Sequence, residues 1–285
     1  MYAIEVNRLC KKYKAQKDIE GFELKDVSFS LPTGCIMGLV GENGAGKSTT
    51  IKLILDVLES DSGTVSLLGK NTAEERILAK DDIGVVMDTP AFSAVMTAVQ
   101  LNSVMKHTYS RWNEDNFFSL LDRFGIDKKK AFKKLSTGMK MKLGIASALS
   151  HDAKLLILDE PTSGLDPVIR KEIIEMFNEF TRDRTHSVLI SSHIVSDLER
   201  LCDYVAFMKR GRLVLCGEKD RLLEKYGIIQ CTAQELESIP EAAVKSKRES
   251  PYGVEAIVER GFIPEGMQIN PIGIEELFIM YVSGR

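Results

Sequence analysis

The sequence has 285 residues, of which 44% are hydrophobic and 28% are charged, a composition typical of a folded globular chain. The length predicts one large domain with a smaller one attached. The 38 basic and 41 acidic residues give a net charge of −3, so the chain lacks the positive field that nucleic-acid binding requires, and we expect no nucleic-acid partner.

The first part of the chain is predicted to form two strands, followed by a unit made of a strand, a loop and a helix. Alternating apolar residues predict strands at Ala3–Val6 and Leu24–Phe29, separated by charged residues. The apolar run Cys35–Val40 predicts a buried strand ending at Gly41, and a helix is expected over Lys47–Leu58. Three further elements are expected next: a strand at Gly63–Gly69, a helix at Ala73–Lys80 and a buried strand at Ile83–Met87.

In the middle of the chain the sequence pattern first predicts helices and then predicts strands that alternate with helices. From Thr89 the apolar residues follow a helical spacing, which predicts a helical insert over about 89–150. A second alternating block follows, with strands at Leu155–Leu158, Ser187–Ser191 and Tyr204–Met208 and helices at Pro167–Thr181 and Ile194–Leu201. The alternation predicts an α/β fold, in which a largely parallel sheet has helices on its faces.

The last part of the chain differs in composition from the rest. After a helix at Glu218–Tyr226, the tail holds four of the eight prolines: Pro240, Pro251, Pro264 and Pro271. This shift predicts a main domain over residues 1–227 and a small α+β accessory domain over residues 228–285. Within the tail, strands are expected at Val254–Val258 and Gly261–Ile263, and a helix at Ile274–Val282.

A glycine-rich loop joins the strand that ends near Val40 to the helix that begins at Lys47. Its sequence, GENGAGKS, fits the phosphate-loop pattern GxxxxGK[ST], in which backbone N–H groups and a helix N-terminus surround a polyphosphate. We expect Lys47 to reach the β- and γ-phosphates of ATP and Ser48 to bind Mg²⁺. The nucleotide contacts expected here are Gly41, Asn43, Gly44, Ala45, Gly46, Lys47, Ser48 and Thr49.

Two adjacent carboxylates follow the apolar strand Leu155–Leu158. In an open α/β sheet the carboxyl ends of the strands are where ligands bind, so Asp159 and Glu160 are expected at the nucleotide. Asp159 suits the Mg²⁺ shell. Glu160 suits the orientation or deprotonation of the attacking water, because phosphoryl transfer asks the protein mainly for positioning and charge stabilisation.

Three further elements resemble those of the ABC (ATP-binding cassette) ATPases and occur in that family's order. The run LSTGM at 135–139 resembles the family's LSGGQ signature, SGLD at 163–166 resembles its D-loop, and His193 resembles its switch histidine. The resemblance covers the chain from about Ala3 to Tyr226. It implies a P-loop NTPase core with a β-rich N-terminal subdomain and a helical signature subdomain.

The resemblance also implies a dimer with ATP at its interface, formed by two copies or by paralogous ATPases. Ser136 and Gly138 then contact the γ-phosphate held by the partner, and Asp166 lies at the interface. His193 joins Lys47 and Glu160 as a catalytic residue, through its contact with the γ-phosphate. Ser136 and Asp166 also precede predicted helices, so both are expected as helix N-caps.

Two further positions, Tyr13 and Asp88, match the family less directly, and each has an alternative interpretation. Tyr13 matches the position at which the family places an aromatic ring against adenine, while a surface tyrosine at a strand end would look the same. Asp88 stands where the family commonly has a glutamine, and its carboxylate is expected to serve the Mg²⁺ region in place of that amide. A solvated acid in a loop is the alternative for Asp88. The signature departs from its family pattern at Thr137 and Met139.

The whole sequence also bears on where the chain acts. Five cysteines, with no CxxC pair, indicate neither a disulfide framework nor a zinc site and fit a reducing cytoplasm. No stretch approaches the ~18 apolar residues of a membrane helix, and Met1–Lys12 has no apolar signal core. If the protein serves a membrane, separate permease subunits must supply the spans, and the chain is expected on the cytoplasmic face of the cell membrane.

The overall texture resembles bacterial ABC-2 type exporters of antimicrobial peptides or drugs, so the expected function is that of an ATP-hydrolysing motor subunit. The alternatives are a non-transport ABC ATPase and a nucleotide-dependent regulatory module. The sequence has one phosphate loop, and Lys47 and Asp159 are only 112 positions apart, which disfavours tandem cassettes and a long coiled-coil insertion. A regulator without catalysis is disfavoured because Glu160 and His193 are both present.

Overall fold

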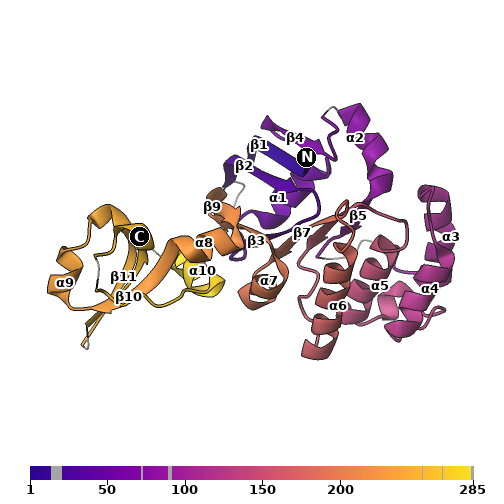
Figure 1. The fold of residues 1–285 in the computed structure, drawn as a ribbon. Helices are drawn as coiled ribbons and strands as arrows, with labels where there is room; N and C mark the ends of the chain where they lie inside the picture. The colour runs from indigo at the N-terminus through magenta and orange to yellow at the C-terminus, as the bar shows by residue number, and fades with distance from the viewer. Residues whose placement is uncertain (14–20, 72, 89–91, 252, 265, 284–285) are drawn as a thin grey trace.

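The computed structural model describes residues 1–13, 21–71, 73–88, 92–251, 253–264 and 266–283. Within these ranges the chain forms three β-sheets, with helices packed mainly around the largest one (Figure 1). The expected start of the helical insert, Thr89, and the last residue of the expected tail, Arg285, lie outside the described ranges. None of the described helices is long and apolar enough to cross a lipid bilayer.

The central sheet has the strand order β5-β6-β7-β3-β8-β9. Its strands are β3 (Ile36–Gly41), β5 (Ile83–Val86), β6 (Leu155–Asp159), β7 (Ser187–Ser192), β8 (Tyr204–Lys209) and β9 (Arg212–Glu218). Neighbouring strands are parallel from β5 to β8, whereas β9 pairs antiparallel with β8. The apolar runs predicted as strands suit this sheet because parallel strands are covered on both faces. The parallel α/β prediction is therefore confirmed.

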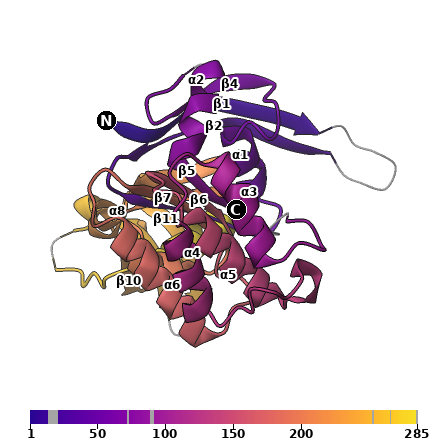
Figure 2. The same cartoon turned by 90° about the vertical axis from the view of Figure 1, so that its right-hand side faces the viewer.

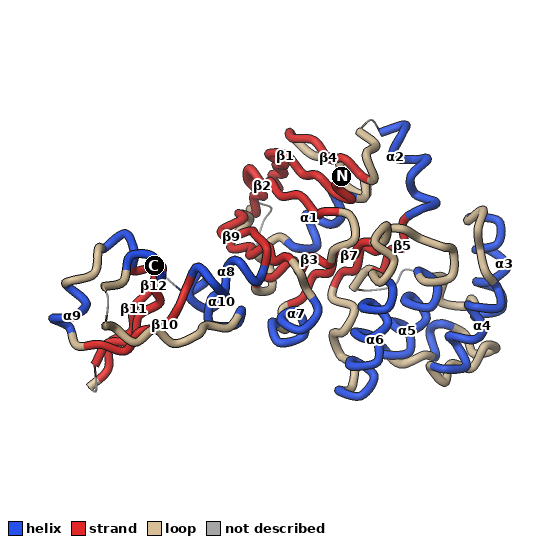
Figure 3. Tube along the Cα trace, in the orientation of Figure 1, coloured by secondary structure: helices blue, strands red, loops and turns tan. Residues whose placement is uncertain are grey.

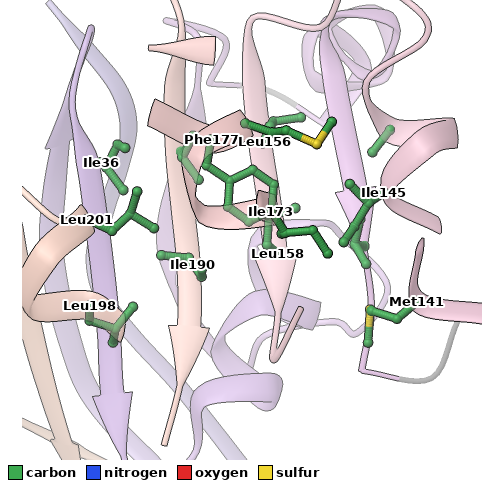
Figure 4. Packing of buried hydrophobic residues seen from close by; sticks show 14 of the residues in the cluster. Ile36, Met141, Ile145, Leu156, Leu158, Ile173, Phe177, Ile190, Leu198 and Leu201 are labelled. Carbon is green, nitrogen blue, oxygen red and sulfur yellow. The ribbon is translucent and has the colours of Figure 1, made fainter. Parts of the chain in front are cut away.

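Alternate side chains of β6 enter two different hydrophobic clusters. Leu156 and Leu158 pack with the helices on one face of the sheet, as the close view in Figure 4 shows, and Leu155 and Ile157 pack on the opposite face. All four side chains are fully buried. This period of two is the geometry of an extended strand, and it places the strand's carboxyl end between two packed layers.

The N-terminal sheet lies over one face of the central sheet and has the order β2-β1-β4. Its antiparallel strands are β1 (Tyr2–Tyr13), β2 (Phe22–Pro32) and β4 (Ser62–Leu67), and the helices of this region are α1 (Lys47–Ile54) and α2 (Ala73–Ala79). Strand β1 is longer than predicted, because an antiparallel strand tolerates charged residues on a solvent-facing side. Helix α1 is shorter than predicted and is followed by Asp56, whose φ of 56° is left-handed.

Helices cover the opposite face of the central sheet, away from the N-terminal strands (Figure 2). The expected helical insert contains α3 (Ala98–Thr108), α4 (Glu114–Arg123) and α5 (Thr137–Ala148), and the next helices are α6 (Pro167–Phe180) and α7 (Val195–Leu201). Thr97 begins α3 with a capping box, and Asn113 caps α4 by accepting from the N–H of Asn116. Local sequence therefore sets where these helices begin.

The tail forms a small sheet to one side of the main body, visible at the left of Figure 3. Helix α8 (Lys219–Lys225) leads into antiparallel strands β10 (Tyr226–Cys231), β11 (Val244–Ser250) and β12 (Gly253–Glu259), joined by helix α9 (Ala233–Glu237). The predicted strand Gly261–Ile263 is wrong, because Arg260–Phe262 forms a 3-10 turn. The guanidinium of Arg260 donates to the carbonyls of Tyr226 and Asn270, at 2.8 and 3.2 Å, which holds the chain in this turn.

The last helix, α10 (Ile274–Ser283), leaves this small sheet and packs on the main body. Ile274 and Leu277 are fully buried in the same cluster as Phe207 of β8, and the rings of Phe207 and Phe278 meet edge to face at 5.5 Å. The N–H of Ile274 also donates to Glu199 of α7 at 3.0 Å. The tail thus has its own sheet and small core but shares a helix with the main body.

Candidate active site

The phosphate loop and the carboxyl end of β6 open onto a common cavity of about 490 Å³. Nine of the residues predicted for the site line it: Asn43, Gly44, Gly46, Lys47, Ser48, Thr49, Asp88, Glu160 and His193. Phe22, Glu42 and Ser163 complete the lining. Gly41 and Ala45 belong to the same motif but are buried and do not line the cavity. The structure thus gathers residues from five separate parts of the sequence.

The shape of the phosphate loop depends on its glycines. Gly44 and Gly46 have φ values of 81° and 110°, in the left-handed region that favours glycine. A Cβ on Gly41 would lie 2.8 Å from the carbonyl oxygen of Met208, so that position is also restricted by close packing. Helix α1 begins at Lys47 without a side-chain cap, which leaves its first N–H groups for an anion at the cavity.

Lys47, Glu160 and His193 form a connected group in the lining of the cavity. The ammonium of Lys47 donates to the Gly41 carbonyl at 2.7 Å and lies 3.1 Å from Oε1 of Glu160. That second contact has the distance of an ion pair without hydrogen-bond geometry, since Oε1 has no hydrogen-bond partner among the described residues. Nδ1 of His193 lies 2.7 Å from Oε2 of Glu160. The three side chains thus place two basic groups on one carboxylate.

The backbone at Glu160 is unusual for a residue with a side chain. Its φ of 51° is left-handed, a conformation that costs energy in residues other than glycine. Strand β6 ends at Asp159, and this turn of the backbone carries the next carboxylate into the cavity, where Glu160 is 8% exposed. Strained backbone of this kind is common at functional sites.

The oxygen donors around the cavity fit a magnesium ion. Ser48 and Asp88 line the cavity, and Asp159 is buried at the end of β6. Hydroxyl and carboxylate oxygens are the donors that this hard cation prefers. Among the described residues, no three His, Cys, Asp or Glu side chains are grouped so as to hold a metal by themselves. Such a donor set suits Mg²⁺, which is commonly bound by one or two carboxylates together with water and substrate phosphates.

Three of the predicted signature and D-loop residues, Ser136, Gly138 and Asp166, do not line the cavity of their own chain, although Ser163 of the D-loop does. Ser136 caps α5 by accepting from the N–H of Met139 at 3.3 Å, and Asp166 caps α6 by accepting from the N–H groups of Val168 and Ile169, both at 3.1 Å. Both N-cap predictions are confirmed. Gly138 lies in the first turn of α5.

The aromatic ring found at the cavity is not the one singled out by the sequence. Phe22, the first residue of β2, lines the cavity, and Tyr13 is 37% exposed with its ring centroid 6.2 Å from that of Phe22. The missed signal was the position of Phe22, two residues before Leu24 in the alternating strand pattern. Ser163 was also missed as a cavity residue, although it opens the D-loop motif three residues after Glu160.

Comparison with known proteins agrees with this arrangement. The profile of the ABC transporter family matches residues 24–163. The lantibiotic transport ATP-binding protein SrtF of Streptococcus pyogenes is 36% identical over 199 residues, which cover 69% of this chain and 85% of that protein. The chain belongs to the family of ABC transporter ATP-binding proteins.

Two further relatives extend the likeness of this ABC ATP-binding protein. The bacitracin transport ATP-binding protein BcrA of Enterococcus faecalis is 34% identical over 215 residues, covering 75% of this chain and 68% of that protein. A solved structure of an ATP-binding subunit of an ABC transporter superposes with a TM-score of 0.68 at 30% identity, covering 78% of this chain and 92% of the other. The predicted family and P-loop NTPase fold are confirmed.

Proposed function

We propose that this ABC ATP-binding protein hydrolyses ATP with Glu160 as the residue that activates water, and so drives a membrane exporter of peptides or drugs. The observation that carries the proposal is the contact of Glu160 with both Lys47 and His193 in the lining of the phosphate-loop cavity. A carboxylate held in this way is suited to orient a water molecule toward a bound γ-phosphate.

Each side chain in this mechanism has a separate task. Lys47 stabilises the negative charge of the β- and γ-phosphates, and His193 fixes the rotamer of Glu160 through its 2.7 Å contact while it faces the γ-phosphate. Phe22 and Tyr13 offer ring surface to the adenine base. Ser48, Asp88 and Asp159 would hold Mg²⁺, which supplies charge neutralisation on the phosphates when it is bound.

We also propose that the site is completed by a second subunit, either another copy or a paralogous ATPase. Ser136, Gly138 and Asp166 lie outside the cavity of their own chain, so they are free to face the nucleotide held by a partner. The N-terminus of α5, which Ser136 caps, would then direct its partial positive charge at the partner's γ-phosphate.

The named relatives and the fold support a proposal for transport and location. The relatives are named for bacitracin transport and lantibiotic transport, which supports peptide or drug export here. We propose that separate permease subunits provide the membrane path and hold this chain on the cytoplasmic face of the cell membrane. Membrane fractionation tests this: the chain should sediment with membranes when the permease is co-expressed, and recovery in the same fraction without it would contradict the proposal.

The hydrolytic role is tested with Glu160→Gln, which keeps the size of the side chain and removes its charge. We expect ATP binding to remain and turnover to fall by at least ~100-fold, the range for loss of general base catalysis. ATP should then hold the variant as a dimer in size-exclusion chromatography. Glu175→Gln, on the exposed surface of α6, is the matched control and should hydrolyse ATP normally. Turnover by the Glu160 variant close to that of the wild-type chain would contradict the assignment.

A further inference from the structure

A buried serine lies between the phosphate-loop strand and the strand that carries the acidic pair. Ser191 is the fifth residue of β7, where it is in register with Leu39 of β3 on one side and with Asp159 of β6 on the other. Its side chain is fully buried. A hydroxyl in such a place needs hydrogen-bond partners, since burying it without any is costly.

Both partners of this hydroxyl belong to the acidic pair. The Oγ of Ser191 donates to Oδ1 of Asp159 at 2.6 Å, and it accepts from the backbone N–H of Glu160 at 3.1 Å. The same N–H also lies 3.2 Å from the carbonyl oxygen of Ser191. One residue of β7 therefore contacts the side chain of Asp159 and the backbone of Glu160 together.

These contacts act at a strained position of the backbone. Glu160 has the left-handed backbone described above, and such a conformation persists only when surrounding contacts hold it. The hydroxyl and the carbonyl of Ser191 both receive the N–H of this residue. The short bond to Asp159 fixes the orientation of a carboxylate that is itself 1% exposed.

We infer that Ser191 is a positioning residue of the ATPase: its hydroxyl sets the orientation of Asp159 toward Mg²⁺ and holds the backbone turn that presents Glu160 to water. The inference rests on the proposed hydrolytic function. A hydroxyl can donate to the carboxylate and accept from the N–H at once. Alanine removes both bonds, whereas threonine keeps the hydroxyl.

The chain offers a matched control on the same strand. Ser187 begins β7 and is also fully buried, but its hydroxyl accepts from the N–H of Gly34 at the opposite end of the strand. Ser187→Ala and Ser191→Ala each remove one buried hydroxyl from one strand. If the role of Ser191 is purely structural, both variants should lose stability to a similar degree and both should keep their ATPase activity.

The experiment compares the wild-type chain with Ser191→Ala, Ser191→Thr and Ser187→Ala. Calorimetric titration measures ADP affinity with and without Mg²⁺, and ATPase assays measure kcat and the Mg²⁺ concentration for half-maximal rate. For Ser191→Ala we expect a ~10-fold smaller gain in ADP affinity on adding Mg²⁺, a ~10-fold higher Mg²⁺ requirement and a ~10-fold lower kcat, because a hydrogen bond to a charged group is lost. Its Mg²⁺-free ADP affinity should stay unchanged.

Ser191→Thr should restore the Mg²⁺ dependence, and Ser187→Ala should keep it while its melting temperature falls. The inference is overturned if Ser191→Ala keeps the wild-type gain in ADP affinity on adding Mg²⁺, or if Ser187→Ala loses as much of that gain. If the wild-type chain itself does not hydrolyse ATP, the proposed function fails, and the titrations with ADP still decide whether Ser191 orients the Mg²⁺ ligand.

Discussion

Replacing Leu277 by alanine should destabilise the main body, although this residue lies far along the chain in the tail. Leu277 is fully buried against the cluster that contains Leu198 and Phe207, and loss of a buried leucine side chain costs about 2–5 kcal/mol of unfolding free energy. Ile279 lies on the same helix and is 51% exposed. Its replacement by alanine should change the unfolding free energy by no more than about 0.5 kcal/mol.

The assay is urea unfolding followed by the fluorescence of Trp112, the single tryptophan of the sequence. Trp112 packs on Phe117 of the helical insert, with ring centroids 5.1 Å apart, so its signal reports on the main body and not on the small sheet. We expect the Leu277→Ala transition to move to lower urea, while the Ile279→Ala transition stays in place. An unchanged Trp112 transition in Leu277→Ala would refute the view that α10 is part of the core of the main body.

Two further predictions concern the cavity. Asp88→Ala should raise the Mg²⁺ concentration needed for half-maximal ATPase activity, and Asp88→Gln should restore much of the activity; an unchanged Mg²⁺ dependence in the alanine variant would place Asp88 outside the metal region. Phe22→Ala should weaken ATP binding by about 2- to 10-fold, the range for an aromatic contact of 0.5–1.5 kcal/mol, with kcat retained. Equilibrium titration checks this, and a larger loss in Tyr13→Ala than in Phe22→Ala would assign the adenine contact to the tyrosine.

Sequence patterns located most of the elements that build the cavity. The strand Leu155–Leu158 could be predicted because a parallel strand buried on both faces is a continuous apolar run, and the structure extends it by one residue, to Asp159. Strand β9 was missed because its burial is only partial and the turn before it is atypical. Arg210 and Gly211, with φ values of 46° and 76°, form that two-residue turn in place of the usual Asn-Gly or Asp-Gly.

Local sequence patterns also predict most of the residues of the site. Lys47, Glu160 and His193 occupy positions that local motifs mark, so each can be predicted without knowledge of its neighbours in space. Ser191 carries no such mark, because a serine in an apolar strand looks like any other buried residue. Its role depends on a register between β6 and β7, and strand register between distant segments is not readable from one sequence.

The packing of α10 on the main body has a consequence for how the protein is made. Ile274 lies 67 positions after Phe207, and a ribosome adds about 5–20 residues each second, so the two are synthesised about 3–13 s apart. During that interval Phe207 lacks its ring contacts with Phe278 and Tyr281 of α10. A newly made chain therefore completes its nucleotide-binding body only after the small sheet has been synthesised, and a chain released early exposes the kind of apolar surface that chaperones and proteases recognise.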